Sequence, residues 1–478
     1  MMNPAWIKTK LNDSPVARWT VLFLVAYAMM MGYYVTYQMS PLEHLLESPV
    51  AEGGLGWSST DYGFVSSAYG FINVFLFMLF IGGVILDKMG VRFTGILACS
   101  LMVLGVSILY YAIEYVPPTR LTVVDCPFLG FHHHAYKTQV LLSALGFSIF
   151  GVGDEMCGIT TSKAMVKWFT GHELALAMGI QVAMARLGTG AAMTFSVSMT
   201  FGHRLSTPIL VGTALLITGL LAYLVYCIMD VKLDKSVAHA PKKDTAKDAT
   251  EEERFRLSDI LLTLKSAGFW HITAISLLYY SAMSPFLNFA TKLMISKYGI
   301  DEAYAGAIPA IIPFGSILLT PLFGTVYDRI GRGATLIIVG TSMLTAVHLM
   351  LSLPVYSGAF AVMLMIILGV AFSLVPGVMW PSVPKIIPLK RLGNAYSIIF
   401  FIQNIGLMVV RFIIGKVLDV DSHTLSDGRK IIDFTHAQWI FAAFGLGAVL
   451  FSISLKWLDA RKNYGLERSN IRQTTAKS

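Results

Sequence analysis

Two short stretches decide the fold of this chain: GVILDKMGVR at residues 83–92 and GTVYDRIGR at residues 324–332. Each follows a long apolar run, and the second lies 241 residues after the first. A second match pairs FGVG (150–153) with LGVA (368–371), which lies 218 residues further on. A longer loop at 116–140 in the first half accounts for the difference of 23 residues. Two offsets reconciled by one loop predict a chain built from two related halves.

The composition around these repeats is that of a membrane protein. Hydrophobic residues make up 55% of the 478, charged residues 13%, and the mean hydropathy is +0.66. A soluble protein carries about 25% charged residues, so this chain must face lipid. Its apolar stretches are each long enough to cross a bilayer of about 30 Å. They lie at 19–39, 60–86, 93–115, 139–166, 173–201, 207–229, 267–296, 303–326, 334–353, 359–383, 392–418 and 436–458.

The predicted fold is therefore an all-α integral membrane protein, with twelve transmembrane helices in two pseudo-symmetric six-helix bundles. Residues 1–229 form the N-terminal half, 230–266 a polar linker, and 267–478 the C-terminal half with a basic tail. Placing the N-terminus inside leaves 26 of the 36 Lys and Arg residues on the cytoplasmic side. The positive-inside rule then places both termini and the linker in the cytoplasm. The same distribution explains the net charge of +8 without a nucleic-acid partner.

The repeated loops are candidates for gating. Glycines permit tight turns and close helix approach, and the aspartate can pair with a cation on a neighbouring helix in one conformational state. A polar hairpin that merely obeys the positive-inside rule is the alternative for a single copy. Two copies at matching positions favour gating. The residues concerned are Gly83, Asp87, Lys88, Gly90 and Arg92 in the first loop, and Gly324, Asp328, Arg329 and Gly331 in the second.

Two charged residues lie deep inside adjacent predicted helices. Glu155 and Arg186 are roughly 15 and 20 Å from the cytoplasmic helix ends at 1.5 Å per residue. An ionised group at that depth costs about 2.5–3.5 kcal/mol on insertion scales, so it must face a cavity or a partner. A salt bridge that locks two helices is one interpretation. The other is a substrate site, with Arg186 holding a carboxylate and Glu155 an ammonium group or a proton.

Neighbouring residues refine this prediction. Asp154 points about 100° away from Glu155 around the helix, so Glu155 is the preferred site residue. The counterparts of Glu155 and Arg186 in the second half are Ser373 and Asn404. The charged site is thus expected in the first half alone, with uncharged polar groups opposite.

Further candidates lie in other spans. Tyr34 and Tyr37 share a helix face and either hydrogen-bond a substrate or sit at the membrane interface. Trp380, in a segment with three prolines, forms either a wall of the site or an interfacial contact. Gln403 and Asn404 either line the cavity or bond between helices. Lys292 and Arg411 are interpreted as snorkelling side chains near the outer ends of their spans.

Longer motifs narrow the resemblance. The segments GVGDE (151–155), WFTGHELALAMGIQVAMARLG (168–188), PFLNFATKLMISKYG (285–299) and WPSVPKIIP (380–388) followed by LGNAYSIIFFIQNIGL (392–407) occur in five spans. With the repeated loops, they resemble the major facilitator superfamily, and within it the lysosomal dipeptide uniporter branch and its bacterial relatives. The resemblance implies that Glu155 and Arg186 hold the two ends of a dipeptide and that Trp380 contributes to the site.

The expected function is alternating-access transport of small zwitterionic solutes, dipeptides first, by uniport or with protons. A proton-coupled carrier of organic anions is the alternative in the same class, and a non-transporting scaffold or sensor is the alternative in another. No nucleophile–base pair, nucleotide loop or metal-ligand set suggests an enzyme, a cofactor or a metal. The only Asn-x-Ser/Thr, at Asn12, is cytoplasmic and no sorting signal is visible, so the expected location is a bacterial inner membrane, as a monomer.

Overall fold

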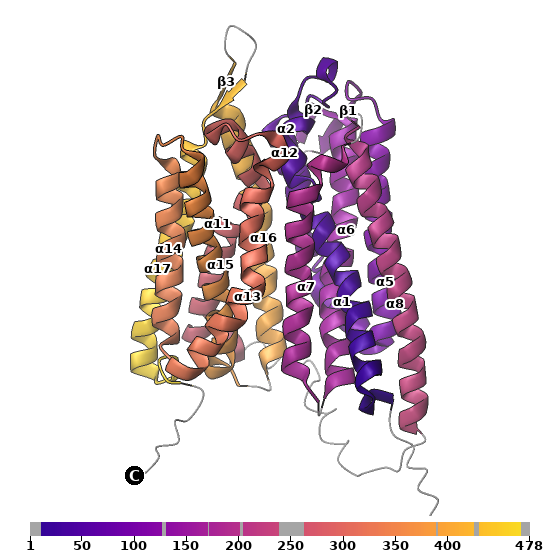
Figure 1. The fold of residues 1–478 in the computed structure, drawn as a ribbon, viewed down its shortest axis with the longest axis vertical. Helices are drawn as coiled ribbons and strands as arrows, with labels where there is room; N and C mark the ends of the chain where they lie inside the picture. Colours follow the sequence, from indigo (N-terminus) through magenta and orange to yellow (C-terminus); the bar gives the residue numbers. More distant parts are fainter. Residues whose placement is uncertain are drawn as a thin grey trace, which may run out of the picture.

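The computed structural model describes residues 11–126, 131–170, 172–200, 204–238, 262–388, 391–424 and 430–469. Long helices stand side by side in two bundles (Figure 1). The first bundle contains α1 (Pro15–Gln38), α3 (Ser59–Ala68), α4 (Phe71–Phe75), α5 (Met78–Tyr115), α6 (Thr138–Phe169), α7 (Leu174–Phe195) and α8 (Ser206–Ala238). The second contains α11 (Ala267–Tyr298), α13 (Ala307–Ile330), α14 (Gly333–Ser352), α15 (Gly358–Ile386), α16 (Leu392–Val420) and α17 (Thr435–Lys462).

Short elements mark one end of the molecule, which we call the hairpin end (Figure 1). It carries α2 (Glu43–Glu47), α12 (Glu302–Ala305) and two antiparallel hairpins, β1 (Leu121–Cys126) with β2 (Phe131–Lys137) and β3 (Ser422–Thr424) with β4 (Lys430–Ile432). The hairpins were not expected from the sequence. The opposite end, from which the chain leaves α17, is called the terminal end.

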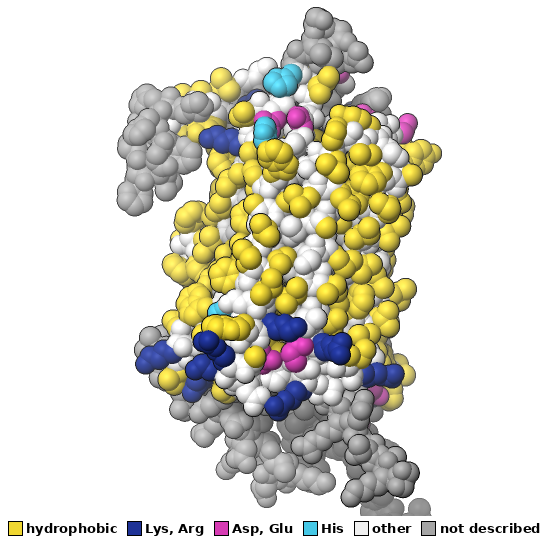
Figure 2. Space-filling view, turned by 90° about the vertical axis from the view of Figure 1, so that its left-hand side faces the viewer, with side chains coloured by type: hydrophobic (Ala, Val, Ile, Leu, Met, Phe, Trp, Pro, Cys, Tyr) yellow, Lys and Arg dark blue, Asp and Glu magenta, His cyan; other side chains and the backbone are white. Residues whose placement is uncertain are grey.

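The surface matches a membrane protein. Within the described residues, nine helical segments are long and apolar enough to span a bilayer. Hydrophobic side chains cover the middle of the face shown in Figure 2, and Lys and Arg gather towards the terminal end. Helices α7 and α11 are not among the nine, although they run alongside the others. The all-α membrane fold is confirmed, and the count of twelve spans stays a prediction.

Two boundaries differ from the sequence prediction. The expected span 60–86 is divided into α3, α4 and the first part of α5, and α5 is broken at Gly90, close to the expected start of the span 93–115. Gly90 bends α5 with a φ of 77°, a conformation that glycine adopts without the steric cost of a Cβ atom. Helix α8 runs to Ala238, nine residues into the predicted linker. Residues 239–261 of that linker lie outside the described residues, so the domain boundaries stay predictions.

Local sequence signals explain several helix starts. Ser14 caps α1 by accepting a hydrogen bond from the Ala17 N–H, and Pro15 occupies the first turn. Ser58 and Asp61 form a reciprocal capping box at the start of α3. Ser266 caps α11, which ends at Gly299 in the left-handed conformation. These caps fix where the helices that carry the interior polar residues begin.

The two bundles approach closely between α3 and α16. A Cβ atom on Gly415 would lie 2.4 Å from the Ser59 carbonyl oxygen, and one on Gly63 would lie 2.9 Å from the Arg411 carbonyl oxygen. Small residues let helix backbones meet in this way in membranes. The hairpin end of the interface between the halves is therefore tightly packed.

Candidate functional site

A buried carboxylate pair on α6 lies at the centre of the site. Tyr69, which directly follows α3, places its hydroxyl 3.0 Å from Asp154 Oδ2 and 3.3 Å from Glu155 Oε1. Thr36 on α1 donates a further hydrogen bond of 3.1 Å to Asp154 Oδ2. One phenol hydroxyl has a single proton to donate, so Tyr69 cannot donate fully to both carboxylates. Asp154, which the sequence analysis placed second to Glu155, therefore shares the Tyr69 hydroxyl with it, and the choice of Glu155 as the substrate residue stays a prediction.

Arg186 on α7 turns towards the second half. Its guanidinium lies 4.5 Å from the centre of the Phe372 ring on α15, a cation–π contact. Among the described side chains, no ion pair joins Glu155 to Arg186. In this conformation, Glu155 and Arg186 therefore do not form the salt bridge that one interpretation of the sequence suggested.

The two predicted charged site residues, Glu155 and Arg186, both contact the second half, and their contacts occupy equivalent places in the internal repeat. Asn404 on α16 donates a hydrogen bond of 3.4 Å to Glu155 Oε1, while Arg186 meets α15 at Phe372. Since α6 corresponds to α15 and α7 to α16 in the repeat, the two contacts are related by the internal symmetry. Asn404, the counterpart of Arg186, thus lies against Glu155 across the interface.

The second half also contributes a charge, which corrects the expectation of uncharged groups there. Arg411 on α16 is only 3% exposed, so the snorkelling interpretation is wrong. It donates to the Ser66 carbonyl oxygen at 3.1 Å and to Ser284 Oγ at 3.2 Å. Its guanidinium lies 5.6 Å from the centre of the Tyr69 ring. Arg411 therefore lies beside the tyrosine whose hydroxyl contacts both carboxylates.

The two predicted site tyrosines of α1 take different partners. The Tyr34 hydroxyl donates to Met199 Sδ at 3.4 Å, within the first half. The Tyr37 hydroxyl lies 3.0 Å from Ser284 Oγ of α11 and so joins the Arg411 network across the interface. Three positions apart on a helix, these side chains are close neighbours, yet they contact different elements.

Trp380 lies in an aromatic cluster inside the second half. Its indole N–H donates to the Tyr280 hydroxyl at 3.2 Å, and its ring centre lies 5.0 Å from that of Phe400. Gln403 accepts a hydrogen bond of 2.8 Å from Ser276 of α11. Of the two α16 amides, Gln403 thus bonds between helices, whereas Asn404 reaches the carboxylate pair.

Lys292 provides the second correction to the snorkelling interpretation. Its side chain is 1% exposed and its ammonium lies 3.1 Å from Glu43 Oε1 and 2.5 Å from Glu47 Oε1. It also donates to Ser59 Oγ at 2.6 Å. Lys292 comes from α11, while its three partners come from the first half. This buried cluster holds the two halves together at the hairpin end.

Other contacts reinforce the closure of that end. Ser40 Oγ donates to the carbonyl oxygens of Leu287 and Asn288, and the Tyr62 hydroxyl donates to that of Asn288. Both Asp419 carboxylate oxygens accept backbone N–H groups, from Ser59 and Thr60. Among the described residues, these hydrogen bonds and ion pairs join the two halves at the hairpin end.

The first repeated loop is bound within its own half. Asp87 pairs with Lys163 of α6 at 2.5 Å. Arg92 and Lys167 both pair with Asp230 of α8, at 3.1 and 2.7 Å. Gly83 has open space beside it and Lys88 is exposed.

A further ion pair within the first half lies at the start of α7. Glu173 accepts a hydrogen bond from its own backbone N–H and pairs with Arg18, and both contacts lower the pKa of the Glu173 carboxyl group.

The second repeated loop is covered by the segment that follows α17. The backbone N–H groups of Arg332 and Gly333 donate to the carbonyl oxygens of Glu467 and Leu466. A Cβ atom on Gly331, whose φ is 73°, would meet the backbone of Arg468 at 2.6 Å. Gly324 faces the Gly377 carbonyl oxygen of α15, and Arg329 is exposed. The two copies of the motif therefore have different partners in this conformation.

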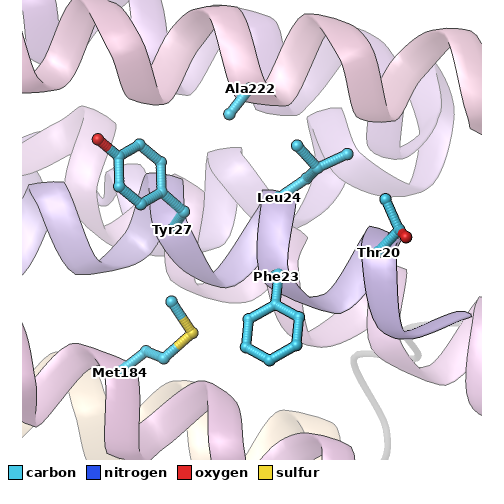
Figure 3. A pocket seen from close by; sticks show the side chains of 6 residues that line it. All are labelled: Thr20, Phe23, Leu24, Tyr27, Met184 and Ala222. Atoms are coloured by element: carbon cyan, nitrogen blue, oxygen red, sulfur yellow. The ribbon is translucent and has the colours of Figure 1, made fainter. Parts of the chain in front are cut away.

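A pocket of about 410 Å³ lies elsewhere, between α1, α7 and α8 (Figure 3). Its lining is almost entirely apolar and consists of Thr20, Phe23, Leu24, Tyr27, Met184 and Ala222. Phe23 is 54% exposed, so this groove opens on the lipid-facing surface. It contains none of the predicted site residues. Among the described residues, no group of three His, Cys, Asp or Glu side chains could hold a metal.

Two apolar helical bundles enclose charged groups at their shared interface, which is an arrangement typical of membrane transporters. The family model of the Major Facilitator Superfamily matches residues 21–410. The chain belongs to this superfamily. This is the superfamily that the sequence motifs predicted.

Individual relatives agree. The lysosomal dipeptide transporter MFSD1 of Gallus gallus is 30% identical over 58% of this chain and 62% of its own length. That of Danio rerio is 29% identical over 74% of this chain and 71% of its own. The chain thus spans less than two thirds of the chicken relative. Among solved structures, the xylose transporter XylE from E. coli has a TM-score of 0.67 at 15% identity, covering 93% of this chain and 99% of that one. A POT family transporter in complex with a thioalcohol-conjugated peptide has a TM-score of 0.64 at 14% identity, over 92% and 96%.

Sequence reasoning missed several residues of the site. Tyr69 and Phe372 carry no signal, because aromatic residues are common in apolar helices. Thr36 is equally inconspicuous. Asp154 and Arg411 did carry one, since an ionisable residue inside a span is functional by default. If the sequence analysis had applied that rule to Asp154 and Arg411 as it did to Glu155 and Arg186, it would have identified both as site residues.

Proposed function

We propose that this chain transports dipeptides by alternating access, with the peptide amino group at Glu155 and its carboxylate at Arg186. One observation carries the proposal: the two opposite charges lie on adjacent helices and face the second half without pairing with each other. A free ammonium and a free carboxylate on one small molecule would satisfy both. The relatives named as dipeptide transporters support this substrate class.

The chemistry fits a carrier that accepts many peptides. Every dipeptide has the same two terminal charges, whereas its side chains vary. Arginine presents a planar fork that matches a carboxylate. The aromatic side chains Phe372, Tyr280 and Trp380 offer apolar surface on the opposite side. In this proposal the first half binds the two charged ends of the peptide, and the aromatic residues pack against its side chains. The carrier would therefore accept peptides with different side chains.

The conformation supports the transport cycle. Cross-half contacts close the hairpin end, while the ion pairs of the first repeated loop stay within one half. We infer that the hairpin end faces outward and the terminal end faces the cytoplasm. In this proposal both repeated loops change partners as the terminal end closes. We also propose that the protein is a monomer in a bacterial inner membrane, with both termini in the cytoplasm.

Modified peptides test the assignment of each terminus. In proteoliposomes, uptake of a labelled dialanine is competed with unlabelled dialanine, N-acetyl-dialanine and dialanine amide. Wild-type protein should prefer free dialanine over both. Glu155→Gln should lose discrimination against the acetylated peptide, and Arg186→Gln discrimination against the amide. The assignment would be overturned if each variant lost discrimination against the other modified peptide, or if both variants kept the wild-type preference. Arg120→Gln, an exposed change, serves as control.

A proton-coupled organic-anion carrier is the second candidate, because Arg411 adds a further guanidinium near the carboxylate pair. Under this alternative, succinate competes for uptake and dialanine does not. A scaffold or sensor predicts no uptake at all and no loss of function in Glu155→Gln. Proton coupling is read separately, from dialanine accumulation driven by an imposed pH gradient.

A further inference from the structure

Asp154 lies in the middle of a line of four hydrogen-bond links. Thr36 Oγ1 lies 3.1 Å from the Gly32 carbonyl oxygen and 3.1 Å from Asp154 Oδ2. The Tyr69 hydroxyl lies 3.0 Å from Asp154 Oδ2 and 3.3 Å from Glu155 Oε1. Each link needs one proton, and a hydroxyl group has only one to donate. If both carboxyl groups are ionised, the two hydroxyl groups therefore fill only two of the four links.

A proton on Asp154 fills a third link. Asp154 Oδ2 can then donate to Tyr69, and Tyr69 can donate to Glu155. Thr36 can donate to the carbonyl oxygen of Gly32, one turn earlier in α1. Asp154 Oδ1 is buried and has no hydrogen-bond partner among the described groups. An ionised carboxylate with an empty buried oxygen is much costlier than a neutral carboxyl group in the same place, so the geometry favours a protonated Asp154.

The surrounding groups do not compensate an ionised Asp154. The titratable and charged residues that the neighbouring elements place around this part of α6 are Tyr33 and Tyr37 on α1, Tyr69 after α3, Cys99 on α5, Glu155 on α6 itself, Arg186 on α7 and Arg411 on α16. Tyrosine and cysteine side chains are neutral near pH 7. The Arg186 guanidinium lies against the Phe372 ring, and Arg411 donates to two oxygens outside the carboxylate pair. Within the described residues, neither arginine forms an ion pair with Asp154 or Glu155.

We propose that Asp154 holds a proton in the empty site and releases it when a dipeptide binds at Glu155. The peptide ammonium group supplies new donors to the Glu155 carboxylate, so the Tyr69 hydroxyl can turn its proton to Asp154. The Asp154 O–H bond then breaks, and its proton leaves to the surrounding water. The ammonium charge and the hydroxyl donors of Tyr69 and Thr36 stabilise the new carboxylate. Peptide and proton therefore oppose each other, and each lowers the affinity for the other by the same factor.

The inference rests on the proposed dipeptide site, and calorimetry separates the two. Dialanine is titrated into the purified full-length protein in buffers of different ionisation enthalpy, which gives the number of protons released on binding. Between roughly pH 5 and 7 both dialanine termini keep their charges, because their pKa values are about 3.5 and 8. Release should approach about one proton per dialanine. The affinity should then rise by up to about tenfold per pH unit, since proton release favours binding at higher pH.

Asp154→Asn is the decisive variant, because its amide can donate to Tyr69 as a protonated carboxyl group does but has no proton to release. It should bind dialanine without proton release and with an affinity that does not vary over this pH range. Asp301→Asn makes the same chemical change at an exposed position, where asparagine also caps a helix. This control should release as many protons as wild type. Tyr69→Phe removes the hydroxyl that passes between the two carboxyl groups, so it should release fewer protons, and it tests the proposal if Asp154→Asn folds poorly.

Infrared difference spectra identify the group that loses the proton. Dialanine binding should remove a protonated-carboxyl C=O band in wild type and not in Asp154→Asn. Wild-type binding without proton release overturns the proposal and leaves the dipeptide site standing. Undiminished release in Asp154→Asn, or in Tyr69→Phe, overturns it as well. Absence of dialanine binding at every pH overturns the proposed function, and this inference with it.

Discussion

At the scale of single residues, the function depends on how charges are presented at the interface between the halves. Arg186 stacks on Phe372 and keeps its donors free of acidic partners among the described residues. Asp154 and Glu155 share one tyrosine hydroxyl. A carrier needs charged groups with free hydrogen-bonding capacity, because groups that are fully paired in the empty protein gain little when a substrate binds.

Arg186→Lys tests the importance of the guanidinium fork. Lysine keeps the charge but cannot make two parallel hydrogen bonds to a carboxylate. Losing one charge-assisted hydrogen bond costs about 1.5 kcal/mol, which weakens dialanine binding roughly tenfold. Titration calorimetry in detergent measures the dissociation constant. An unchanged constant would show that Arg186 acts only as a point charge.

Gly32→Ala tests how tightly α1 packs against the carboxylate pair. A Cβ atom at Gly32 would lie 2.3 Å from Asp154 Oδ1. Such overpacking should lower the free energy of unfolding by about 1–3 kcal/mol. The matched control is Gly158→Ala on α6, which has nothing within 4 Å of the added methyl group. Thermal unfolding in detergent should show a lower midpoint for Gly32→Ala alone, and equal midpoints would contradict the packing argument.

At the scale of elements, each half protects its terminal end differently. The first repeated loop is held by ion pairs to α6 and α8. The second is capped by the segment after α17, where both Glu467 carboxylate oxygens accept hydrogen bonds from Thr335, at 2.9 and 3.0 Å. Arg332 precedes α14 without a side-chain cap. A glutamate distant in sequence thus does the work of an N-cap.

Removal of that cap should destabilise the second half. Glu467→Ala leaves the Thr335 N–H without its acceptor and should cost about 1 kcal/mol, the usual value for a lost N-cap. Glu467→Gln retains one acceptor oxygen and should stay closer to wild type. The unfolding midpoints of the two variants provide the measurement. If alanine and glutamine behave alike, the cap contributes nothing.

At the scale of the whole molecule, the orientation in the membrane is the property most open to direct test. Single cysteines replace Tyr356, which is 70% exposed at the hairpin end, and Arg461, which is exposed at the terminal end. A membrane-impermeant maleimide applied to intact cells should label the first and not the second. Permeabilised cells should label both. The reverse pattern would invert the proposed orientation and the positive-inside argument with it.

The sequence alone determined the membrane class, the duplication and the family, and it indicated Glu155 and Arg186. These features are local: span length, hydropathy and repeated loop motifs do not depend on distant contacts. Tertiary structure alone decided how the charges pair. It buried Lys292 with Glu43 and Glu47, brought Arg411 to Tyr69 and set Asn404 against Glu155. The physical reason is that a helix near its outer end exposes a charge to water or buries it in an interface equally well. Only the packing of one half against the other selects between the two.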